Sequence, residues 1–168
     1  GFYLATVHRA ATSDDEAALG SVVRAFASLD RPVLWPVHPR TRRNLAAFGL
    51  DEAVAAAPGI VDAEPVGYPE MMALLRASAG LLTDSGGMQK EAYFFGVPCV
   101  TLRDSTEWVE TVETGWNVLA GTDEQRIAEA VAGMHAPDVH PALYGDGHAA
   151  EAVVRVLEQY LDETKRTG

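Results

Sequence analysis

The sequence is poor in cysteine and in basic residues, and it lacks any long apolar run. Cys99 is its single cysteine, which excludes an intrachain disulfide and suggests a small buried thiol in a reducing, cytoplasmic setting. No run of about 18 apolar residues and no secretory signal pattern is present, so no membrane partner is expected. With 13 Lys and Arg against 24 Asp and Glu, nucleic acid is a poor candidate partner, because a phosphate polymer needs a basic surface.

What the sequence does contain is a globular composition with uneven charge. Hydrophobic residues make up 48% of its 168 residues, which is typical of a packed domain rather than a disordered chain. Residues 1–103 contain 9 basic and 11 acidic side chains, whereas residues 104–168 contain 4 and 13. An anionic ligand is therefore expected mainly on the first part of the chain. Because the sequence starts directly in a predicted strand, we expect it to be a piece of a larger protein.

Short apolar runs alternate with amphipathic segments, which is typical of βαβ units and a parallel sheet. The pattern predicts strands at 2–7, 32–36, 60–61, 80–83, 98–102 and 117–119, and helices at 14–29, 40–48, 69–78, 87–95, 123–134 and 147–163. The expected fold is one three-layer, Rossmann-like α/β domain over residues 1–168. Such sheets bind ligands at the carboxyl ends of their strands, so the informative residues should follow the apolar runs.

The strongest local signal is the turn after the fourth predicted strand, Asp84-Ser85-Gly86-Gly87. Two glycines allow a sharp turn and a close approach of ligand to main chain. The helix that begins there offers free N–H groups to a phosphate or diphosphate, and Ser85 can cap the helix or bind the same anion. Glu91, about one turn on, can accept hydrogen bonds from ribose hydroxyls. An ordinary Ser cap with a solvated Glu91 is the alternative, since neither a Walker loop nor G-x-G-x-x-G is present.

Two histidines follow the first and second predicted strands, and so belong to the same sheet edge. His8 can donate to a phosphate oxygen or act as general acid toward a leaving phosphate, and Arg9 can donate a fork of N–H groups to it. His38 stands between two prolines that hold its backbone. Each histidine also fits a plain cap or turn. Neither has a Cys or Asp partner at metal-ligand spacing, so no metal is expected.

A third group of polar residues follows the fifth predicted strand. Arg103 is the one basic residue before a run of carboxylates, and Thr106 and Glu107 are candidates to bind sugar hydroxyls. Trp108 can stack on a ring, although a place in the core is the favoured interpretation. No G-x-S-x-G elbow or Cys–His pairing marks a nucleophile.

Taken in order, these motifs resemble the non-hydrolysing UDP-N-acetylglucosamine 2-epimerases. The matching pieces occur in the family's order over essentially the whole chain: His8-Arg9, Pro36-Val37-His38-Pro39, Thr83-Asp84-Ser85-Gly86-Gly87 with Glu91, Gly96-Val97-Pro98, Leu102-Arg103-Asp104 with Thr106-Glu107, Glu113, Gly115, Asn117, Gly121 and Tyr144-Gly145-Asp146-Gly147. The resemblance implies one half of a GT-B architecture. This chain is similar to the C-terminal, UDP-binding half, and an N-terminal domain that is missing here would complete the cleft.

The resemblance also implies roles for individual residues. In the family, the counterparts of Ser85, Gly86 and Gly87 bind the diphosphate, and the counterpart of Glu91 binds the ribose. The counterparts of Tyr68 and Met71, in the loop 67–71, pack against the uracil. The counterpart of His8 lies near the phosphates at the reacting end. The implied reaction inverts C2 of a UDP-N-acetylhexosamine by eliminating UDP and adding it back. Its main acid–base carboxylates belong to the missing domain. The resemblance therefore predicts an isomerase without a cofactor, a full-length homodimer, and an isolated chain that binds UDP weakly and is inactive.

The chain departs from the family pattern at three places. Ala10-Ala11-Thr12 replace an acidic residue and an Asn, and Met71 replaces an aromatic residue. Trp108-Val109 replace Arg-Pro. Because this last change removes a cation, Arg9 and Arg103 would have to make more of the contacts with the diphosphate. Segments 38–43 and 106–117 are similar to the branch that acts on UDP-2,3-diacetamido-glucuronic acid. Two other functions fit the same residues: the nucleotide-binding half of a GT-B glycosyltransferase, and a module that senses a nucleotide sugar without chemistry.

Overall fold

The computed structural model describes residues 1–167, and their side chains through residue 162. The chain divides into two compact units, residues 1–138 and a segment that starts at Val139. The first unit contains the sheet, and the second contains helix α9 (Ala149–Thr167), which starts two residues later than predicted. The predicted single domain over residues 1–168 stays a prediction, and Gly168 lies outside the described residues.

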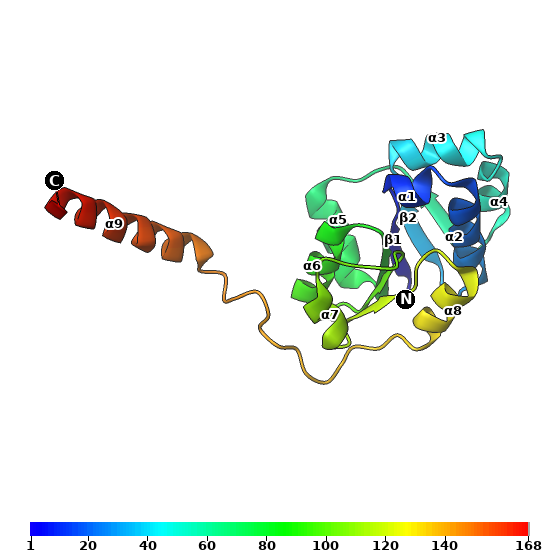
Figure 1. The fold of residues 1–168 in the computed structure, drawn as a ribbon. Helices are drawn as coiled ribbons and strands as arrows, with labels where there is room; N and C mark the ends of the chain where they lie inside the picture. Colours follow the sequence, from blue (N-terminus) through cyan, green and yellow to red (C-terminus); the bar gives the residue numbers. More distant parts are fainter. Residues whose placement is uncertain (168) are drawn as a thin grey trace. The chain divides into compact units, whose positions relative to one another are not determined.

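The first unit is built on a parallel sheet with the strand order β3-β2-β1-β4-β5-β6 (Figure 1). Each strand forms within two residues of its predicted bounds: β1 (Tyr3–Thr6), β2 (Val33–Pro36), β3 (Ile60–Ala63), β4 (Gly80–Thr83), β5 (Cys99–Thr101) and β6 (Asn117–Leu119). The chain runs outward from β1 to β3, returns to pair β4 with β1, and then runs outward on the other side. This is the order of a Rossmann-like sheet, so the predicted α/β fold is confirmed.

Eight helices connect and cover the described strands of the first unit: α1 (Ala10–Ser13), α2 (Glu16–Ser28), α3 (Pro39–Ala47), α4 (Asp51–Ala56), α5 (Tyr68–Ala77), α6 (Gly86–Phe95), α7 (Val109–Glu113) and α8 (Glu124–Ala132). Three of them, α1, α4 and α7, were not predicted, because helices of four to six residues are too short to show a helical period. The prediction of a single helix from residue 14 was wrong at its start. Asp15 caps α2 instead, accepting a hydrogen bond from the Ala18 N–H at 2.9 Å.

A second correction concerns the segment 67–71, which the family resemblance predicted as a loop, although the sequence pattern predicted a helix from residue 69. Gly67 is the N-cap of α5, and the segment after it is the helix's first turn. Pro69 favours this start, because the first turn of a helix needs no N–H donor from proline. Tyr68 and Met71 are therefore held on a helix, one turn apart and on the same side.

The helices cover both faces of the sheet and make three layers. Side chains of α2 and α8, such as Phe26 and Ile127, are completely buried against one face. Leu75 of α5 is completely buried against the other, and Figure 1 shows the same division of the helices. Cys99 lies in this second cluster, where burial raises the pKa of its thiol to about 12. As predicted, the single cysteine is a small buried side chain.

Candidate functional site

The candidate site lies at the boundary between β1 and β4, where the strand order reverses direction. The carboxyl ends of these strands pair in register, Thr6 beside Thr83. Open α/β sheets bind their ligands in the crevice at such a switch point. His8 and Arg9 follow β1, and Ser85 follows β4. The structure thus brings predicted residues from both halves of the sheet to one edge.

Helix α6 begins at the predicted Ser-Gly-Gly turn. Ser85 is its N-cap, and the Ser85 hydroxyl accepts a hydrogen bond from the Met88 N–H at 3.4 Å. A Cβ at Gly86 would lie 3.4–3.5 Å from three neighbouring side chains, whereas a Cβ at Gly87 would meet nothing closer than 3.9 Å. Gly86 therefore allows close packing, and the space lies beside Gly87. The N–H groups and dipole of the helix favour an anion at this end.

Asp84 fixes the main chain of both basic candidates. Its side chain is completely buried, and its carboxylate accepts hydrogen bonds from the His8 N–H at 3.0 Å and the Arg9 N–H at 2.8 Å. The same carboxylate lies 3.8 Å from His8 Nδ1. A buried carboxylate needs such donors, because an unpaired charge is costly away from water. Asp84 thus ties the end of β4 to the turn after β1, and its carboxylate lies near the imidazole of His8.

The two predicted histidines face each other across a small hollow. Their ring centres are 5.6 Å apart. His38 Nδ1 accepts a hydrogen bond from the Arg40 N–H at 3.2 Å, so a neutral His38 carries its proton on Nε2. Both rings line a cavity of about 230 Å³ whose other walls are mostly apolar: Thr6, Val7, Pro36, Pro65, Val66, Met71 and Met88. A cavity of this kind fits a flat, partly polar ring.

Arg9 and Arg103 gather around one carboxylate at the start of α6. Glu107 accepts hydrogen bonds from both Nη atoms of Arg103, each at 3.0 Å, and lies 3.8 Å from Arg9 Nη2. The hydrogen bonds from Arg103 are the main reason that the pKa of Glu107 falls to about 2. One atom of Glu107 and one of Arg9 would touch a Cβ at Gly86. Arg9 and Arg103 therefore both lie near the start of α6, and both are close to the carboxylate of Glu107.

The predicted ribose ligand, Glu91, has a partner from the neighbouring helix. The Tyr68 hydroxyl of α5 donates a hydrogen bond to Glu91 Oε1 at 2.8 Å. This hydrogen bond is the main cause of the raised pKa of Tyr68. Met71 and Met88, one turn along from Tyr68 and one turn before Glu91, line the cavity. Facing side chains of α5 and α6 thus form one continuous wall.

The loop between β5 and α7 uses its polar groups differently from what the sequence predicts. The Thr106 hydroxyl donates to Gln89 Oε1 at 2.5 Å. Trp108 is only half-buried, so the favoured core position was wrong. Its indole N–H donates to the Gly86 carbonyl at 2.8 Å, and the Lys90 ammonium lies 4.4 Å from a ring centre of the indole. Trp108 therefore fastens the loop to the start of α6.

Three residues of the site were missed by the sequence analysis as functional candidates. Asp84 and Met88 flank the Ser-Gly-Gly turn, and Gln89 follows it. Position in the motif was a usable signal for Asp84, because an acidic residue at a strand end meets the N–H groups of the neighbouring turn. For Met88 and Gln89 no local signal distinguishes a cavity wall or a buried polar contact from an ordinary helix position.

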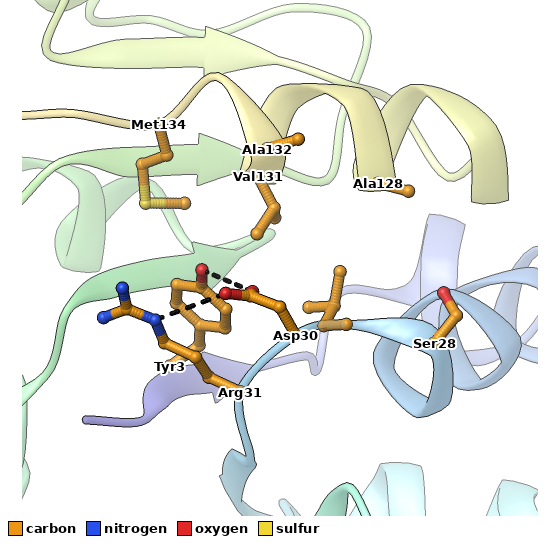
Figure 2. A pocket seen from close by; sticks show the side chains of 9 residues that line it. Tyr3, Ser28, Asp30, Arg31, Ala128, Val131, Ala132 and Met134 are labelled. Carbon is orange, nitrogen blue, oxygen red and sulfur yellow. Dashed lines mark hydrogen bonds and ion pairs between the residues drawn. The ribbon is translucent and has the colours of Figure 1, made fainter.

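A larger hollow, of about 490 Å³, lies at the opposite edge of the sheet (Figure 2). Its polar groups bind one another: the Tyr3 hydroxyl donates to Asp30 at 2.9 Å, and Arg31 lies 3.4 Å from the same carboxylate. Met134 and Val131 face them from the other wall. This hollow is at the amino ends of the strands, away from the edge where such sheets bind ligands, and we do not assign it to the site.

Two kinds of feature are missing from the part of the chain that the structure describes. No group of three or more His, Cys, Asp and Glu side chains there has the arrangement to hold a metal ion. No helix of the described residues combines the length and the apolarity needed to cross a membrane.

The fold and this edge define a class, the Rossmann-like α/β domains with a Ser-Gly-Gly turn that opens a helix at the switch point of the sheet. A model of the UDP-N-acetylglucosamine 2-epimerase family matches residues 1–158 of the chain. The chain belongs to this family, as its motifs predicted.

Individual relatives agree with this assignment. The chain is 43% identical over 157 residues to a UDP-N-acetylglucosamine 2-epimerase homolog of Methanococcus maripaludis, with 93% of the chain and 44% of the relative covered. It is 45% identical over 162 residues to the UDP-2,3-diacetamido-2,3-dideoxy-D-glucuronate 2-epimerase of Pseudomonas aeruginosa, with 94% and 44% covered. The chain thus spans less than half the length of these relatives.

Solved structures give the same picture. The crystal structure of Methanocaldococcus jannaschii UDP-GlcNAc 2-epimerase in complex with UDP-GlcNAc and UDP superimposes with a TM-score of 0.85 at 36% identity, covering 94% of this chain and 45% of that one. The S. aureus MnaA–UDP structure superimposes with a TM-score of 0.81 at 28% identity, covering 96% and 45%. The predicted Rossmann-like half of a GT-B architecture is confirmed.

Proposed function

We propose that this chain is the UDP-binding domain of a UDP-N-acetylhexosamine 2-epimerase. The observation that carries the proposal is that Arg9, and Arg103 through Glu107, gather beside Gly86 at the start of α6, next to the open space at Gly87. A helix N-terminus with two guanidinium groups suits a diphosphate. The M. jannaschii relative, with a similar fold, was crystallised with UDP-GlcNAc and UDP.

The uracil and the ribose of UDP would bind next to this turn, in the cavity and along the wall formed by α5 and α6. The cavity that His38, Met71 and Met88 line is of a size and polarity to receive the uracil ring. Glu91, on the wall that leads from the cavity, would accept hydrogen bonds from the ribose hydroxyls. Tyr68 holds that carboxylate in place through its own hydrogen bond.

His8 is the candidate for chemistry in this chain. Elimination removes the C2 proton and breaks the bond between C1 and the phosphate oxygen, with the departing UDP taking up negative charge. His8, whose main chain Asp84 holds at the switch point, can give a proton to that oxygen and take it back when UDP returns to C1 while a proton is delivered to the other face of C2. The base at C2 would come from a domain outside this chain, because we find no free carboxylate beside the turn among the described side chains.

The partners follow from the same reasoning. Because the chain covers 44% of its relatives, we propose that an N-terminal domain forms the other wall of the cleft. The family resemblance, rather than the coverage, is the basis for proposing that the complete enzyme is a cytoplasmic homodimer. Thr106 and Glu107 as ligands of sugar hydroxyls stay predictions.

UDP binding tests the proposal directly in this chain. Calorimetric titration should show weak UDP binding that Gly87→Ala weakens further, because the added methyl would occupy the open space at the start of α6, where a Cβ meets nothing closer than 3.9 Å. Gly20→Ala, in α2 and away from the site, is the matched control and should bind UDP as the parent chain does. Absence of UDP binding by the folded parent chain would refute the proposal.

Turnover requires a longer chain that carries the upstream domain. With UDP-GlcNAc or the UDP-diacetamido-glucuronate on which the P. aeruginosa relative is named to act, incorporation of solvent deuterium at C2 identifies an epimerase. Transfer of the sugar to an acceptor would identify a glycosyltransferase instead. Binding without either reaction would identify a sensor module.

A further inference from the structure

Gln89 occupies an unusual position for an amide side chain. It lies on α6, three residues after Gly86, and is 1% exposed. Its Oε1 accepts hydrogen bonds from the Thr106 hydroxyl at 2.5 Å and from Asn117 Nδ2 at 3.1 Å. Its Nε2 has no hydrogen-bond partner among the described residues. An unsatisfied buried donor is costly, so the favourable contribution of the Gln89 carboxamide comes from its acceptor oxygen.

The second partner extends this contact into a buried network. Asn117, at the start of β6, accepts a hydrogen bond from Thr101 of β5 at 2.7 Å and donates another to Thr111 of α7 at 3.2 Å. Thr111 in turn donates to the Trp108 carbonyl at 2.7 Å. The network joins α6 to β5, β6 and α7. The loop 102–108 connects two of these elements, β5 and α7.

The same loop carries two of the charged residues of the site. Thr106 accepts a hydrogen bond from the Trp108 N–H at 3.1 Å while it donates to Gln89. Trp108 also reaches the first residue of α6 through its indole. The loop is thus fixed to α6 at two points, and Arg103 and Glu107 lie on either side of Thr106 in the sequence.

We propose that Gln89 is a positioning residue, whose buried carboxamide holds Thr106 and thereby places Arg103 and Glu107 beside the diphosphate turn. The proposal rests on the proposed function of that turn. Its physical basis is that a charged fork contributes to phosphate binding only within a narrow range of distance and angle. Gln89 itself touches no ligand, since its side chain is enclosed.

A double-mutant cycle on UDP affinity tests the role. Gln89→Met removes the acceptor at similar volume, and Thr106→Val removes the donor. Each change should weaken UDP binding by about fivefold, and the double variant should be no weaker than either single one, because both break one linkage. Tyr3→Phe, which removes a buried hydroxyl contact at the opposite edge, should lower the midpoint of thermal unfolding and leave UDP affinity unchanged.

A ligand-free signal separates this proposal from the proposed function. The indole N–H of Trp108 should shift in the NMR spectrum and exchange faster with solvent in Gln89→Met and Thr106→Val, but not in Tyr3→Phe. If the parent chain fails to bind UDP while these shifts occur, the positioning of the loop stands and the UDP site fails. Unchanged UDP affinity in the folded variants would overturn the positioning role. Should Gln89→Met not fold, Thr106→Val alone decides between the same outcomes.

Discussion

Glu107 accepts two hydrogen bonds of 3.0 Å from the guanidinium of Arg103, so the strongest fork donor of the candidate site is already engaged. The same carboxylate stands 3.8 Å from Arg9. An incoming diphosphate carries the same kind of charge as Glu107 and needs the same donors. The carboxylate therefore competes with the ligand for both arginines, and this competition has measurable consequences.

Replacing Glu107 should strengthen the binding of UDP. Glu107→Gln removes the competing charge and leaves both guanidinium groups with unpaired positive charge, so the dissociation constant should fall about threefold to tenfold. Calorimetry at low ionic strength measures the change. Glu113→Gln, an exposed site on α7, alters the net charge equally and should have little effect. Weaker UDP binding by Glu107→Gln would mean that the carboxylate orders the arginines rather than competing for them.

The acid stability of the chain should also depend on Glu107. Its pKa is about 2 in the folded chain, against an ordinary value of 4.5. A carboxylate with a depressed folded pKa contributes stability above its unfolded pKa, and that contribution is lost as the pH falls toward 2. The side chain is half exposed, so solvent screening limits the effect to about 1 kcal/mol. Urea unfolding measures the free energy of unfolding at several pH values between about 5 and about 2. Over this range the free energy of unfolding should fall less in Glu107→Gln than in the parent chain.

Asp84 should be a residue on which both stability and binding depend. Asp84→Asn would put an NH₂ group either where Oδ1 stands, 3.1 Å from the His8 nitrogen, or where Oδ2 accepts from both the His8 and the Arg9 N–H. Either orientation sets donor against donor, and the lost hydrogen bonding costs about 1–3 kcal/mol in the free energy of unfolding. UDP affinity should fall as well, because both side chains lose their placement. Asp15→Asn, at the cap of α2, is the control and should be nearly neutral, since Asn caps helices as well as Asp.

Glu91 should distinguish UDP from 2′-deoxy-UDP. If its carboxylate accepts a ribose hydroxyl, Glu91→Gln should weaken UDP binding roughly fivefold to tenfold and leave 2′-deoxy-UDP binding unchanged. Tyr68→Phe removes the neighbouring hydrogen bond while the carboxylate stays, so it should keep the preference for UDP. Equal losses for both nucleotides in Glu91→Gln would assign the residue to the fold of α6 instead of the ribose.

The sequence predicts the parts of this chain that depend on neighbours along the chain. Ser85 caps α6 where the motif places it, because a cap depends only on the residues within one turn. The pairing of Glu107 with Arg103 depends on how a loop folds back, and the burial of Gln89 depends on contacts 17 and 28 residues away. The prediction that Trp108 lies in the core is wrong for the same reason. Its indole finds a carbonyl 22 residues earlier in the chain, and no local pattern carries that information.

The switch point has a consequence for how a bound ligand would stabilise this domain. The strands before and after the middle of the chain run outward from β1 and β4 in opposite directions, so the two halves meet along these two strands and where α2 packs against α8. Asp84 bridges that line at one edge. A nucleotide bound across the same edge would contact both halves and link them non-covalently. Binding of UDP should then slow the hydrogen exchange of backbone amides in β2 and in β5 together, although neither strand belongs to the site.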